Sequence, residues 1–190
     1  MTRGPTLPAH RLPHLPTPLD AFNAAPDDEV GGLLLHCLRS LRWSRRLAAH
    51  RPYPDVESLL AAADEAAYDL SPADLSEALA GESLPELPED TYSAAYTALT
   101  AAHAAYEAKF GHVFVISLGE TPHGESLDRV LEGIRSRLTN DPEEERVVAA
   151  DELRRLARGR LAEKLRGAGP HTSAAPPRGA TGHEQPAPGK

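Results

Sequence analysis

The chain has 190 residues, of which 41% are hydrophobic and 25% are charged, and its 28 acidic residues outnumber its 20 basic ones. This composition is typical of a soluble globular protein, and no apolar run approaches the roughly 20 residues of a membrane span. The acidic excess argues against a nucleic-acid binder, because affinity for nucleic acid depends on basic side chains that neutralise phosphates.

Proline divides the chain into a middle segment and two tails. Ten of the 18 prolines lie in residues 1–18 and 167–190, and ends of this composition bury too little apolar surface to fold. We therefore expect a disordered proline-rich tail at residues 1–16, one folded domain at 17–166, and a disordered tail rich in glycine and proline at 167–190. The folded segment keeps 16 basic and 27 acidic residues.

Helices are expected throughout the first half of the domain. The 31 alanines and nine aromatic residues favour helix over strand. A capping residue followed by proline marks helix starts at Thr17-Pro18 and Ser71-Pro72. Asp27 is predicted to cap a helix that continues through Trp43 and stops at Arg51-Pro52.

The next helices are separated by a loop. Residues 55–70 show helical spacing, and the helix that Ser71 begins is predicted to end at Gly81 in a left-handed stop. Residues 82–88 hold two prolines and are predicted as a loop. An alanine-rich helix is predicted at 91–110.

One apolar segment is not helical in pattern. Residues 113–118 form a β-branched run that is bounded by glycine and has no partner strand, so we expect an extended, buried connector. Helices at 124–139 and 142–166 complete the domain, the second capped by Asp141 with Glu144 three residues later. The sequence therefore predicts an all-α bundle of about seven or eight helices with one extended apolar connector.

The only cysteine, Cys37, lies among leucines. One cysteine cannot form an internal disulfide, and a thiol in this setting is typical of a packed core. Residues 1–18 lack the apolar stretch of a secretory signal. We therefore expect a cytoplasmic protein.

The histidines do not predict a metal site. Four of the nine lie in the predicted tails, and no remaining pair has a close ligand spacing supported by cysteines. His36 and His103 lie on or beside apolar stripes, where a packed histidine is more common than a metal ligand.

Two features are compatible with a ligand site. Carboxylates gather in the loop at Glu82, Glu86, Glu89 and Asp90, and the connector takes backbone amides out of helical hydrogen bonding. A small ligand could satisfy those amides. A solvated acidic loop and a connector that crosses the core would explain the same residues equally well.

Several segments, taken in order, resemble a known family. They are residues 19–23 (LDAFN), Trp43, residues 51–53 (RPY), 106–116 (YEAKFGHVFVI), 135–143 (RSRLTNDPE) and 158–161 (RGRL). Between residues 19 and 165 the chain resembles the 2-oxo-4-hydroxy-4-carboxy-5-ureidoimidazoline (OHCU) decarboxylases, helical enzymes of urate degradation.

The resemblance implies a homodimer that decarboxylates OHCU, a small anionic ureidoimidazoline, to (S)-allantoin without a cofactor. It also implies that the extended segment after Phe-Gly contacts the substrate through its backbone. That segment corresponds here to Val113, Phe114, Val115, Ile116 and Ser117.

The family's polar residues correspond less directly. The position of its catalytic histidine is taken by Glu82, residues 84–90 are too short for its Glu-Gln loop, and the arginine expected near residues 119–125 is absent. Glu82 or Glu86 would then have to transfer the proton. Either side chain could act as the donor only if burial raised the pKa of its carboxyl group.

Two other interpretations stay open. The chain could be a catalytically inactive paralogue that acts as a dimeric binding or scaffold protein, since fold does not fix function. It could also be an unrelated helical interaction domain.

Overall fold

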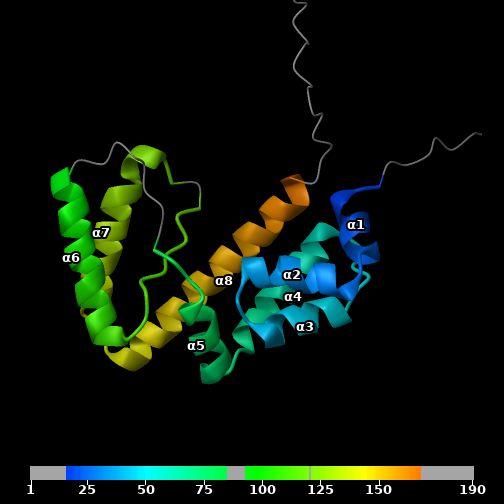
Figure 1. Cartoon of the computed structure of the whole chain (residues 1–190), viewed down its shortest axis with the longest axis horizontal. Coiled ribbons are helices and arrows are strands. Elements are labelled where there is room, and N and C mark those ends of the chain that lie inside the picture. Colours follow the sequence, from blue (N-terminus) through cyan, green and yellow to red (C-terminus); the bar gives the residue numbers. More distant parts are fainter. Residues whose placement is uncertain (1–15, 85–92, 120, 168–190) are drawn as a thin grey trace, which may run out of the picture.

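The computed structural model describes residues 16–84, 93–119 and 121–167 (Figure 1). Within these ranges all regular structure is helical, which confirms the predicted all-α class: α1 (Pro18–Ala24), α2 (Asp27–Cys37), α3 (Leu41–Ala49), α4 (Val56–Tyr68), α5 (Pro72–Ala80), α6 (Ser93–Phe110), the short 3₁₀ helix η1 (His123–Glu125), α7 (Ser126–Arg137) and α8 (Pro142–Gly167). Apart from residues 16 and 167, the predicted tails lie outside the described residues, as does Glu86.

Side-chain caps begin several helices at the predicted positions. Thr17 and Ser71 each cap a helix that starts with proline, and an aspartate three residues later bonds back to the capping residue. Asp141 accepts from the backbone N–H of Glu144 at 2.9 Å, and the Glu144 carboxylate accepts from the N–H of Asp141 at 3.0 Å. These reciprocal bonds satisfy backbone donors that have no partner within the helix.

The long helix predicted from Asp27 to residue 50 is two helices. Leu38 is extended (φ −148°, ψ 122°) and buried, and the Ser40 side chain caps α3 by accepting from the N–H of Trp43 at 3.3 Å. The break lets both Leu38 and Trp43 enter the core, and the Trp43 indole N–H donates to the carbonyl oxygen of Ala63 at 2.9 Å. Tertiary burial thus overrides a continuous helical pattern.

The described residues form two apolar cores. Helices α1 to α5 pack with the inner face of α8 around the larger core, while α6 and α7 lie side by side at the other end around the smaller one (Figure 1). Helix α8 supplies Ala149, Leu153, Ala157, Leu161 and Leu165 to the larger core. Its 26 residues make it the longest element described.

The connector, residues 113–118, lies between these two cores. Val115 is buried in the larger core, and Phe114 in the smaller one. Val113 packs with the larger core and Ile116 with the smaller. This alternation is that of an extended chain, whose successive side chains point to opposite sides, so the expected extended, buried connector is present.

Segments that carry the family resemblance hold the scaffold together. Asn23 exchanges two hydrogen bonds with the backbone of Tyr53, at 2.8 and 2.9 Å. Lys109 donates from Nζ to the carbonyl oxygens of Leu138 and Asn140, both at 2.7 Å. The first set attaches α1 to the chain after α3, and the second fixes the turn between α7 and α8.

None of the helices in the described part of the chain is long and apolar enough to cross a membrane.

Candidate active site

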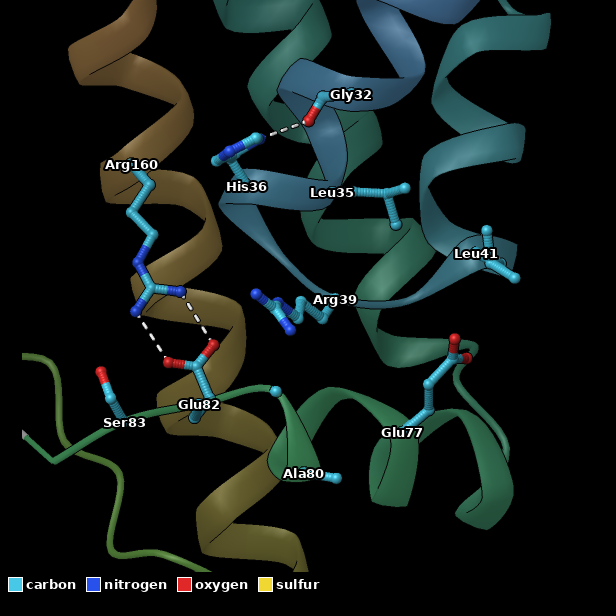
Figure 2. Close-up of a pocket in the computed structure, with 11 residues that line it drawn as sticks. Gly32, Leu35, His36, Arg39, Leu41, Glu77, Ala80, Glu82, Ser83 and Arg160 are labelled. Atoms are coloured by element: carbon cyan, nitrogen blue, oxygen red, sulfur yellow. Dashed lines mark hydrogen bonds and ion pairs between the residues drawn. The ribbon is translucent and has the colours of Figure 1, made fainter.

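An ion pair joins the residue after α5 to the last helix. The carboxylate of Glu82 accepts two hydrogen bonds from the guanidinium of Arg160, from Nη1 to Oε1 and from Nη2 to Oε2, both at 2.8 Å (Figure 2). The Glu82 side chain is 6% exposed and that of Arg160 is 36% exposed. The bonds to Glu82 raise the pKa of Arg160, which therefore stays charged. Arg160 also donates to the carbonyl oxygen of Cys37 at 3.1 Å.

A cavity of about 210 Å³, here called the connector cavity, lies between this ion pair and the connector. Its walls are Glu82, Ser83, Leu84, Phe114, Val115, Ile116, Leu156 and Arg160. The structure thus brings the candidate Glu82 together with three of the five candidate substrate-binding residues of the connector. Val113 lines a different cavity, with Ser76 and His112. Ser117 is not part of the wall, and its N–H donates to the Glu152 carboxylate at 2.7 Å.

Several backbone donors of the connector have no partner among the described residues. The N–H groups of Phe114, Val115 and Ile116 donate to no other described residue, although Phe114 and Val115 are 0% and 2% exposed. Buried backbone N–H groups are nearly always paired with protein, water or ligand. Such groups beside a cavity can receive a carbonyl or carboxylate oxygen. Because N–H groups alternate in direction along an extended chain, those of Phe114 and Ile116 point to one side and that of Val115 to the other.

A buried network holds the connector from the side of α7. Arg137 donates from Nη1 to the carbonyl oxygen of Val115 at 2.6 Å and from Nε to Glu145 at 2.8 Å. The hydroxyl of Tyr106 also donates to Glu145, and burial strongly raises the pKa of Tyr106, so that the hydroxyl keeps its proton. Glu145 is fully buried and accepts a further bond from Asn140 at 2.9 Å. These bonds fix the orientation of the connector.

Arg160 is a residue of the candidate site to which the sequence analysis gave no role. An arginine was expected near residues 119–125, whereas the arginine in the site comes from the last helix. Arg160 was noted only as part of the 158–161 motif. Arg158, two residues earlier, bonds instead to Asp64 and Glu57. The sequence alone does not show which face of α8 lies against the end of α5, so it does not distinguish Arg160 from Arg158.

The two histidines noted in the sequence differ in their surroundings. His36 is exposed, whereas His103 is 5% exposed and its Nε2 has no hydrogen-bond partner among the described residues. Among the described residues no three or more histidine, cysteine or acidic side chains are arranged to hold a metal ion. Burial raises the pKa of the Cys37 thiol to about 11, which makes it a poor nucleophile.

The connector cavity thus combines an arginine, a carboxylate and a segment of extended backbone in one wall, a lining that suits a small polar molecule. The family model described as OHCU decarboxylase matches residues 23–92 and 87–162. The chain therefore belongs to the OHCU decarboxylase family.

Solved structures show the same fold. A crystal structure of (S)-allantoin synthase aligns with a TM-score of 0.61 and 20% identity over 77% of this chain and 53% of that one. A crystal structure of OHCU decarboxylase in the presence of (S)-allantoin has the same TM-score and identity, over 75% of this chain and 99% of that one. This chain thus spans about half the length of the allantoin synthase. No curated protein sequence matches it.

Proposed function

We propose that this protein is an active OHCU decarboxylase that converts OHCU to (S)-allantoin in the connector cavity without a cofactor. One observation carries the proposal: Glu82, Arg160 and the connector residues Phe114, Val115 and Ile116 share the walls of one small cavity. Family membership supplies the substrate class.

The chemistry needs one proton carrier and donors for developing negative charge. The bond between the ring carbon and the carboxylate breaks, carbon dioxide leaves, and the electron pair passes into the conjugated ring, where a nitrogen takes up a proton. The hydroxyl on the same ring carbon loses its proton to become a carbonyl group. The neighbouring carbon then gains a proton on one face, which gives a single enantiomer.

The cavity offers a group for each of these needs. Glu82 is paired as a carboxylate, so it can accept the hydroxyl proton and then return it to the ring carbon as a general acid. Arg160 and the connector amides can hold the ring oxygen on which negative charge develops. Leu84 and Leu156 form an apolar part of the wall, which suits the loss of an uncharged product.

A second candidate function is ligand binding without catalysis. It is favoured by the ion pair itself, because both oxygens of Glu82 are already bonded to Arg160. A substrate anion has to displace Glu82 from the guanidinium or bind through the connector amides alone. In an inactive family member the pair would stay closed, and the cavity would take a neutral or weakly polar ligand.

We further propose that the protein acts as a homodimer in the cytoplasm. The family resemblance supports the dimer, and a single buried cysteine suits a reducing compartment. Light scattering of the purified protein tests the dimer: the mass of one chain would exclude it.

The test of the proposed reaction compares the consumption of freshly generated OHCU with its spontaneous decay. We expect acceleration by the wild-type protein and a loss of about 100-fold or more in kcat/KM for Arg160→Gln, the effect of removing a donor to developing charge. Arg166→Gln is the matched control, because Arg166 is exposed on the same helix and, among the described residues, bonds only to the backbone of Ala162. A wild-type rate equal to spontaneous decay would refute the proposal and leave the binding function.

A further inference from the structure

A second and larger cavity lies on the other side of the Glu82–Arg160 pair. This outer cavity, about 920 Å³, is bounded by the end of α2, the link to α3, the end of α5 and α8 (Figure 2). Glu82, Ser83 and Arg160 belong to the walls of both cavities. The outer cavity has its own polar side chains, which the proposed reaction does not use: His36, Arg39 and Glu77.

Arg39 is a cation without a partner in this cavity. It makes no hydrogen bond or ion pair with any other described residue, although two carboxylates line the same cavity. Glu82 is bonded to Arg160, and Glu77 lies on the opposite side from the Glu82–Arg160 pair (Figure 2). The guanidinium of Arg39 points toward that pair without bonding to it (Figure 2).

The absence of a side chain at Gly81 makes room for Arg39. A Cβ atom built on Gly81 would lie within 2.8 Å of three side-chain carbons of Arg39, well inside ordinary carbon contact. Gly81 has φ −90° and ψ −8°, so the predicted left-handed stop is wrong and any residue could adopt this backbone. Glycine at this position therefore leaves space for the Arg39 side chain and is not required by the backbone conformation.

His36 presents a ring nitrogen to the same cavity. Its Nδ1 is 2.7 Å from the carbonyl oxygen of Gly32, which requires a proton on Nδ1. Nε2 is then the nitrogen left for a ligand, and it becomes a donor when the ring is protonated. His36 and Arg39, at and just after the end of α2, thus line the same cavity as Arg160. The charge of Arg160 is balanced by Glu82.

We infer that the outer cavity is a binding site for a small oxyanion, a carboxylate or phosphate group held by Arg39 with His36 at its edge. The planar guanidinium can bind two oxygens of such a group at once. Glu82 does not oppose binding strongly, because its charge is paired with Arg160. The site is separate from the proposed reaction, and its test uses neither OHCU nor turnover.

Titration of the full-length protein with inorganic phosphate and with acetate, followed by amide and arginine-side-chain NMR shifts, tests the site. We expect saturable binding that shifts the signals of Arg39 and Gly81, and the more tightly bound probe identifies the anion. Arg39→Gln is expected to weaken it at least tenfold, as for the loss of a charged hydrogen-bond donor. Arg45→Gln, which removes another arginine without a described partner, should change it less than twofold.

A second pair of variants separates the site from general surface charge. Gly81→Ala keeps every charge but displaces the Arg39 side chain, and should weaken binding as Arg39→Gln does. Gly31→Ala, where a Cβ meets nothing within 4 Å, should not. Circular dichroism checks that all variants remain folded. No saturable binding of either probe, or binding that Arg39→Gln leaves unchanged, would overturn the inference.

Discussion

The carboxylate of Glu82 and the guanidinium of Arg160 form two parallel hydrogen bonds of 2.8 Å across 78 residues of sequence. This pair gives an acidic chain a balanced charge at the wall of its cavity. The Glu82 carboxylate also occupies the guanidinium of Arg160, to which a substrate anion would bind. Whether a substrate can displace Glu82 from Arg160 therefore distinguishes an active enzyme from an inactive family member.

Removing the Glu82 carboxylate tests its proposed role as proton carrier. Glu82→Ala should reduce OHCU consumption to the spontaneous rate, because among the described residues no other acidic side chain lines the connector cavity. Glu77→Ala is the control, since Glu77 lines only the outer cavity. A Glu82→Ala protein that retains the wild-type rate would remove Glu82 from the mechanism.

The buried pair of Arg137 and Glu145 should dominate the local stability. Glu145→Gln leaves the Arg137 charge buried without a counter-ion, and we expect a loss of about 3 kcal/mol in the free energy of unfolding. Glu143→Gln, in the same turn but 75% exposed, should cost less than about 1 kcal/mol. Urea unfolding measures both, and equal losses would contradict the assignment of Glu145 as the structural anchor.

Gly133 should limit the space beside the connector. A Cβ there would lie 3.1 Å from the Phe114 ring and 3.2 Å from Ile116, so Gly133→Val should destabilise the fold by about 1–3 kcal/mol. Gly159→Val, on an open face of α8, should be neutral or slightly stabilising because valine exceeds glycine in helix propensity. If thermal unfolding gives the two variants the same stability, Gly133 does not constrain the connector.

Burial of His103 should make stability depend on pH. Desolvation lowers the pKa of His103, with Glu107 opposing the shift, so the unfolded chain binds this proton more readily than the folded one. Stability should therefore fall as pH decreases below the ordinary histidine pKa of about 6.5, by at most about 1.4 kcal/mol per pH unit.

Urea unfolding between pH 7.5 and 5 measures this dependence. His103→Phe should flatten the profile, whereas His50→Gln, which changes an exposed histidine, should leave its slope intact. An unchanged slope in His103→Phe would show that other groups cause the dependence.

Local chemistry in the sequence predicted much of the fold. Thr17, Ser71 and Asp141 cap helices because each places an oxygen near free backbone donors, a relationship contained within a few residues. The break at Ser40 was not predictable in this way. It depends on burying both Leu38 and Trp43, which involves helices distant in the sequence.

The candidate site was predictable only in part. The composition of the connector indicated an extended buried segment, and Glu82 was a candidate because the family resemblance puts it at the position of the catalytic histidine. Arg160 was not identified, because α8 carries several arginines and only the packed structure shows which of them reaches Glu82. Glu86 lies outside the described residues, and its role stays a prediction.

The stereochemistry of the product tests the central claim most directly. Freshly generated OHCU is converted with and without the protein, and the optical activity of the allantoin is followed by circular dichroism. An active decarboxylase with a proton carrier on one side of the substrate should give an excess of (S)-allantoin at a rate above spontaneous decay. Racemic allantoin formed at the spontaneous rate would contradict it.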